Sequence, residues 1–109
     1  MMPRYFILAH LISASAGLTP AAAETSLIEK GRAILEANCS RCHAIGLEGT
    51  SAHAEAPPFR EVVKRYPPEN LEEALGEGIS SGHPDMPEFV FSPDDIDAVV
   101  AYLQSLDGK

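Results

Sequence analysis

The strongest constraint in this sequence is the segment Cys-Ser-Arg-Cys-His at residues 39–43, which contains both cysteines of the 109-residue chain. Two thiols separated by two residues and followed at once by an imidazole stay close together in any fold. The preceding residues, 25–38, carry apolar side chains at helical spacing. The fold must therefore present these three reactive side chains at the end of a helix.

The first 23 residues have the pattern of a secretory signal peptide. Arg4 supplies a positive charge, an apolar run follows from Tyr5 to Leu18, and Ala21 and Ala23 form an A-x-A cleavage site. We therefore expect cleavage after Ala23, export to the periplasm of a Gram-negative bacterium, and a domain at residues 24–109. The alternative is an uncleaved anchor, but the run is shorter than the about 20 apolar residues that span a bilayer. No other segment is apolar enough, so we expect no stable membrane insertion.

Charge and size narrow the function of residues 24–109. These 86 residues keep seven Lys and Arg against sixteen Asp and Glu, which gives a net charge of −9. Nucleic acid needs a basic surface, so it is excluded as a partner. The acidity suits docking on a basic patch of a protein partner, or is a solvated surface only. So short a chain, with no tryptophan and 6% aromatic residues, needs a staple or a cofactor to complete its core.

The periodicity of apolar residues predicts helices and no strands. Helices are expected at residues 25–38, with Thr25 or Ser26 as the N-cap, at 59–66 and at 67–79. A last helix has Ser92 as its N-cap and Pro93 at its first position. Two long loops, 44–58 and 80–91, separate these helices, and loops of this length in a small domain usually have a function.

Three chemistries fit the cysteine motif. A disulfide across a two-residue gap would close a small loop and constrain the unfolded chain little. A thioredoxin-like redox pair gains its reactivity at a helix N-terminus, whereas here a helix precedes the cysteines and no β-α-β pattern surrounds them. A zinc site could combine Cys39, Cys42 and His43 with His53 or His83, but the spacing of a second ligand pair is missing. C-x-x-C-H is the attachment signature of c-type haem, in which the cysteines form thioethers and the histidine binds iron. Only the last reading explains why the three residues are contiguous.

The chain resembles the class I cytochromes c of the short bacterial type over residues 25–106. The stretch "GRAILEANCSRCH" is similar to the N-terminal helix and haem site of that family, and "VVAYLQSL" to its C-terminal helix. The resemblance implies an all-α fold with three to five helices wrapped around one covalently bound haem. It also implies that Gly31 contacts Tyr102 where these helices cross. Leu35 departs from the family, which often has an aromatic residue there.

The second axial ligand is predicted to be Met86. It is the single methionine after residue 23 and stands in a loop between Pro84 and Pro87, which is also where the family has its ligand loop. His53 and His83 remain rivals. The resemblance further implies that a carbonyl of the proline segment, Pro57 rather than Pro58, accepts a hydrogen bond from His43.

These residues predict a periplasmic carrier of single electrons and not an enzyme. Iron with two protein ligands changes charge without opening a site for substrate. The expected partners are redox proteins: a dehydrogenase or reductase as donor, and an oxidase or reductase as acceptor. We expect a monomer or a subunit of a hetero-complex. One alternative is a dedicated subunit of a periplasmic dehydrogenase. Another is a haem peroxidase, which would require an open iron position.

Overall fold

The computed structural model describes residues 2–3, 11–80 and 83–108. Residues 1 and 4–10 of the predicted signal peptide, residues 81–82 of the second predicted loop, and residue 109 of the predicted domain lie outside the described residues. The described part contains four α-helices, one 3₁₀-helix and no strand: α1 (Pro20–Cys39), α2 (Phe59–Arg65), η1 (Pro68–Leu71), α3 (Glu72–Glu77) and α4 (Pro93–Leu106). This all-α architecture confirms the predicted fold class. None of these helices is long and apolar enough to cross a membrane.

Helix α1 begins earlier than the sequence pattern indicated. Thr19 is its N-cap and accepts a hydrogen bond from the N–H of Ala22 at 3.2 Å, with Pro20 at the first helical position. The expected cap at Thr25 or Ser26 is wrong, because both residues lie inside the helix. The Thr25 hydroxyl instead donates to the carbonyl of Ala21 at 3.0 Å. Three alanines, the best helix formers, carry the helix through this region. Cleavage after Ala23 remains a prediction and would remove the first turn of α1.

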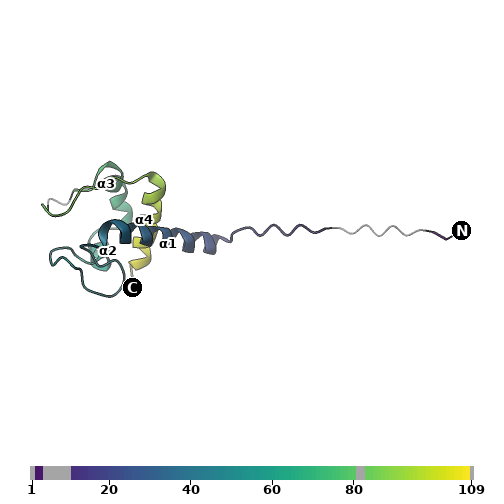
Figure 1. The fold of residues 1–109 in the computed structure, drawn as a ribbon, viewed down its shortest axis with the longest axis horizontal. Coiled ribbons are helices and arrows are strands. Elements are labelled where there is room, and N and C mark those ends of the chain that lie inside the picture. Colours follow the sequence, from purple (N-terminus) through teal and green to yellow (C-terminus); the bar gives the residue numbers. More distant parts are fainter. Residues whose placement is uncertain (1, 4–10, 81–82, 109) are drawn as a thin grey trace.

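Helices α1 and α4 cross closely and form most of the core (Figure 1). Gly31 is buried at the crossing, where a Cβ atom would overlap the carbonyl oxygen of Ala98 and lie 2.9 Å from Cβ of Tyr102. The contact expected between Gly31 and Tyr102 is therefore present. Leu35 of α1 packs into the same cluster as Val99 of α4. The absence of a side chain at one position thus lets two backbones touch and buries the apolar residues on either side.

The sequence predicted one helix at 67–79, but the structure has a 3₁₀-helix followed by the short helix α3 in this segment. The restricted backbone at Pro67 and Pro68 starts a 3₁₀ turn that leads into α3. Gly78 ends α3 with a φ of 119°, so Ile79 lies beyond the helix and forms an isolated antiparallel bridge with Phe89. The predicted start of α4 is confirmed. Its N-cap hydroxyl, at Ser92, accepts from the N–H of Asp95 at 3.3 Å.

Loop 44–58 and the described residues of loop 80–91 lie at the end of the molecule opposite to the N-terminal segment (Figure 1). The phenol of Tyr102 in α4 donates to the carbonyl of Ile45 at 2.8 Å, which ties the first loop to the core. The N–H of Phe91 donates to the carbonyl of Leu75 at 2.9 Å and ties the second loop to α3. The helices therefore anchor one end of each of these two loops, which face each other.

Gly31→Ala should destabilise the fold despite the better helix propensity of alanine. Alanine in place of glycine within a helix is favourable by about 1 kcal/mol, but the new Cβ would press on the backbone of α4 at Ala98. Overpacking of this kind costs about 1–3 kcal/mol. Unfolding of the purified protein in urea should show this loss. Gly46→Ala, where no atom lies within 4 Å of the new Cβ, is the control, and equal stability of the two variants would contradict the close crossing.

Tyr102→Phe should lower stability by about 0.5–1.5 kcal/mol at neutral pH, because the hydrogen bond to Ile45 is lost. Burial is the main cause that raises the pKa of Tyr102 above its ordinary value of 10.0. The unfolded chain therefore ionises first, and the contribution of Tyr102 is lost as pH rises through its folded pKa. The stability gap to wild type should narrow above pH 10. Tyr66→Phe, at an exposed site, should show no such gap, and a gap constant to pH 11 would contradict the prediction.

Candidate functional site

A cavity of about 710 Å³ lies between the C-terminal end of α1 and the two long loops. This volume falls within the about 300–1,000 Å³ typical of small-molecule and cofactor sites. All five predicted site residues line it: Cys39, Cys42, His43, Pro57 and Met86. The rest of the lining is Ala37, Asn38, Arg41, His53, Glu55, Ala56, His83, Asp85, Pro87 and Phe89. Residues from three segments of the chain therefore converge on one site.

The end of α1 places the two cysteines and the histidine on one turn. The carbonyl of Cys39 accepts hydrogen bonds from the N–H groups of Cys42, at 3.1 Å, and His43, at 2.9 Å. Both cysteines are free and half-buried. Burial, and secondarily the neighbouring Cys42, raises the pKa of Cys39 to about 11. Because catalytic cysteines have lowered pKa values, this environment disfavours the thioredoxin-like alternative.

His43 is held by a hydrogen bond and a ring contact. Its Nδ1 lies 2.7 Å from the carbonyl oxygen of Pro57, where it donates the bond. Its ring stacks on Phe59 with 4.8 Å between ring centroids and 16° between planes. With Nδ1 occupied, Nε2 is the nitrogen available to a metal ion, an arrangement common to metal-binding histidines. The carbonyl of Pro57 was predicted from the resemblance, whereas the contact of Phe59 with His43 was not predicted. The position of Phe59 directly after two prolines was the available signal.

The first loop is held in place by several hydrogen bonds to its own neighbours. Ser51 Oγ accepts from the N–H of Ala44 at 3.0 Å, and the carbonyl of Ala44 accepts from Phe59 at 3.0 Å. Arg60 of α2 donates to the carbonyl of Gly49 at 2.7 Å. The loop therefore presents the carbonyl that orients His43 from a braced backbone, although it has no regular secondary structure.

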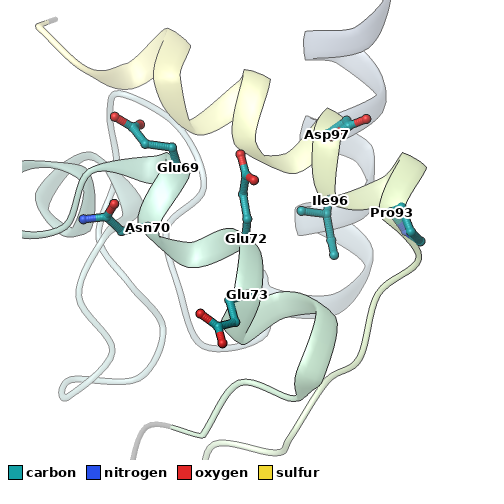
Figure 2. A pocket seen from close by; sticks show the side chains of 7 residues that line it. All are labelled: Glu69, Asn70, Glu72, Glu73, Pro93, Ile96 and Asp97. Atoms are coloured by element: carbon teal, nitrogen blue, oxygen red, sulfur yellow. The ribbon is translucent and has the colours of Figure 1, made fainter.

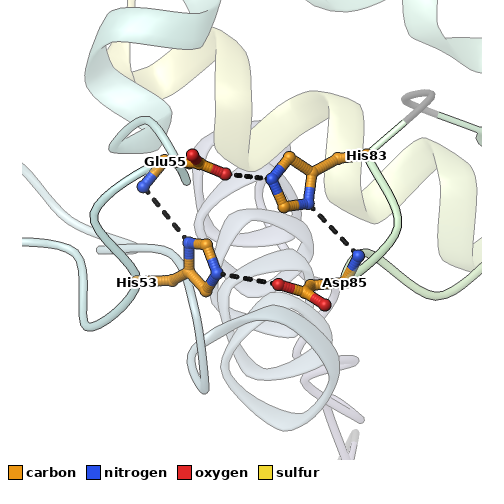
Figure 3. Close-up of polar contacts among 4 residues, drawn as sticks. All are labelled: His53, Glu55, His83 and Asp85. Carbon is orange, nitrogen blue, oxygen red and sulfur yellow. Dashed lines mark hydrogen bonds and ion pairs between the residues drawn. The ribbon is translucent and has the colours of Figure 1, made fainter.

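Met86 lies on the second loop, half-buried, in a turn closed by a hydrogen bond from its N–H to the carbonyl of His83 at 3.2 Å. The rival ligands His53 and His83 also line the cavity, but both nitrogens of each ring have partners among nearby acidic residues (Figure 3). These contacts favour the thioether of Met86 over either imidazole as the second donor to a metal ion in this cavity. Within the described residues, no group of three or more His, Cys, Asp and Glu could hold a metal ion.

A second, more open groove of about 660 Å³ lies between the η1–α3 segment and the start of α4 (Figure 2). It contains none of the predicted site residues. Its lining is largely acidic and consists of Glu69, Asn70, Glu72, Glu73, Pro93, Ile96 and Asp97. This groove shows where part of the negative charge of the chain is concentrated.

Comparison with known proteins gives one family and one related protein. The family model described as Cytochrome c matches residues 28–107. The chain is 37% identical over 94 residues to cytochrome c oxidase subunit 2 of Alkalihalophilus pseudofirmus. That alignment covers 74% of this chain and 26% of the relative, so the chain spans about a quarter of its length. No solved structure matches the chain.

Proposed function

We propose that this chain, which belongs to the cytochrome c family, carries single electrons through one haem c bound in the cavity at the end of α1. Membership of the family implies haem-based electron transfer. The main support for one haem c in this cavity is that Cys39, Cys42, His43 and Met86 all line it. When bound, the haem supplies the one-electron change between ferric and ferrous iron.

The residues of the cavity fit a haem. Cys39 and Cys42 are free thiols on one turn and would form the two thioethers. His43 would bind iron through Nε2, with its ring direction set by the carbonyl of Pro57. Met86 on the facing loop would supply the second axial ligand, and a neutral sulfur donor raises the reduction potential. Two protein ligands would keep small molecules off the iron, which supports a carrier over a peroxidase.

The acidic chain would meet its redox partners through charge complementarity. The net charge of the whole chain is −8, and acidic side chains line the open groove beside α3 and α4 (Figure 2). A basic patch on the partner would speed encounter at low salt. We place this exchange in the periplasm, on the strength of the signal-like residues 1–23. A dehydrogenase or reductase would be the donor.

The related oxidase subunit supports a second candidate. Because the relative is named as subunit 2 of a cytochrome c oxidase, this chain would deliver electrons to an oxidase, either as a free carrier or as a stable subunit. A dedicated subunit of a dehydrogenase has the same iron chemistry. Purification from native membranes and periplasm separates these cases, because a carrier elutes alone and a subunit elutes with its complex.

Covalent attachment is the first test of the proposed function. The purified protein should keep its colour through acid–acetone extraction, because two thioethers hold the haem. Its intact mass should equal residues 24–109 plus one haem. Cys39→Ala with Cys42→Ala should abolish retention, whereas Cys39→Ala alone should leave one thioether. Free extraction of haem from the wild type, or its absence, would contradict the proposal.

Met86→Ala should keep the haem and lose the second axial ligand. The sulfur-to-iron absorption band of the oxidised form should disappear, and added ligands should bind the iron. Axial ligands tune haem potentials over about 0.8 V, so we expect a drop on the order of 100 mV. Met86→His should restore six-coordinate iron at a potential below that of the wild type. A redox titration with spectra measures both effects. A wild type that lacks the sulfur-to-iron band, with a spectrum and potential unchanged in Met86→Ala, would transfer the ligand role to His53 or His83.

A further inference from the structure

Four side chains link the two long loops at the cavity in a reciprocal pattern (Figure 3). His53 Nε2 of the first loop lies 3.4 Å from Oδ2 of Asp85 on the second loop. His83 Nε2 of the second loop contacts Oε2 of Glu55 on the first. Each loop thus contributes one histidine and, two residues later, one acid, and each histidine reaches the acid of the opposite loop. We call these four residues the histidine–carboxylate clasp.

Backbone contacts set the direction of both rings. Nδ1 of His53 accepts a hydrogen bond from the N–H of Glu55, and Nδ1 of His83 accepts one from the N–H of Asp85, both at 3.2 Å. An accepting Nδ1 carries no proton, so the neutral ring bears its proton on Nε2 and donates it to the carboxylate. The clasp therefore holds with neutral imidazoles. The same contacts direct both Nε2 atoms toward carboxylates.

The clasp connects the two sides of the cavity. On one side, the N–H of His53 donates to the carbonyl of Cys42 at 3.1 Å, which joins the first loop to the cysteine turn. On the other side, the N–H of Met86 donates to the carbonyl of His83 at 3.2 Å. A chain of hydrogen bonds therefore runs from the turn that carries His43 to the turn that carries Met86.

The rest of the second loop is attached at a distance from Met86. Among the described residues of this loop, further backbone hydrogen bonds join Phe89 to Ile79 and Phe91 to Leu75, near its return to α4. The imidazoles of the clasp are one-third exposed and its carboxylates about two-thirds exposed. Links of this kind are individually weak in water, but two of them act together across the same gap. They are placed to limit how far the turn of Met86 moves from the first loop.

We propose that the histidine–carboxylate clasp positions Met86 against the haem iron and holds His53 and His83 away from it. This inference rests on the proposed function, since it takes Met86 as the axial ligand. The four residues act as positioning residues and do not themselves bind iron. Loss of one link leaves Met86 able to reach the iron but raises the fraction of time in which it is displaced.

Imidazole titration of the oxidised, haem-loaded protein tests the clasp, because added imidazole competes with Met86 for the iron. Asp85→Ala and His53→Ala should each bind imidazole about two- to tenfold more tightly than the wild type, as expected for one lost polar link. The double variant should gain no more than the larger single one, because both changes break the same link. Asp85→Asn keeps an acceptor oxygen and should stay near the wild type.

Glu48→Ala is the matched control, since Glu48 is an exposed acid of the same loop as Glu55 and lies outside the clasp. Imidazole affinities of Asp85→Ala and His53→Ala equal to that of Glu48→Ala would overturn the proposal. Should Asp85→Ala fail to load haem, Glu55→Ala tests the second link in the same way. Met86→Ala separates the two hypotheses: if the wild type lacks the sulfur-to-iron band, or if Met86→Ala keeps it, the ligand assignment fails and the clasp proposal with it. If Met86→Ala loses the band, but Asp85→Ala and His53→Ala bind imidazole with the same affinity as Glu48→Ala, the clasp proposal alone is refuted.

Discussion

The close contact between α1 and α4 at Gly31 is the constraint on which the rest of the structure depends. A side chain at this position would separate the two backbones, and the core residues on both helices would lose their packing. The crossing also fixes the end of α1, and therefore the cysteine turn, relative to α4. From α4, Tyr102 reaches the carbonyl of Ile45, two residues beyond His43. One contact between helices thus determines where the cysteine turn lies.

Local signals in the sequence were sufficient to predict that the helices exist. The errors in where α1 begins and where α3 ends have local causes. The start of α4 was predictable because Ser92 and Pro93 combine an N-cap with a preferred first residue. The start of α1 was misplaced because residues 19–23 were interpreted as the end of a signal peptide, although Thr19 and Pro20 are the same combination. Helix α3 ends before Ile79 because Gly78 has a positive φ. Glycine permits this conformation, but a glycine in the sequence does not by itself predict it.

The site was predictable where it is contiguous and only in part where it depends on the loops. Cys39, Cys42 and His43 lie on one turn, so their spacing was enough to place them together at the cavity. The carbonyl of Pro57 was placed by resemblance, whereas the stacking of Phe59 on His43 was missed. The links from His53 to Asp85 and from His83 to Glu55 join residues 32 and 28 positions apart. Such contacts depend on the paths of both loops, which neither periodicity nor capping predicts.

The cavity explains how so short a chain could sustain a fold with two long irregular loops. The buried apolar core consists of residues from the helices, with Ile45 as the contribution of the loops. The loops surround a cavity of about 710 Å³, so a haem there would bury the inner faces of both loops and the end of α1. Its binding free energy would then add to the stability of the folded chain, because an unfolded chain offers no such site. On this argument, the features that hold the loops around the cavity serve the fold and electron transfer together.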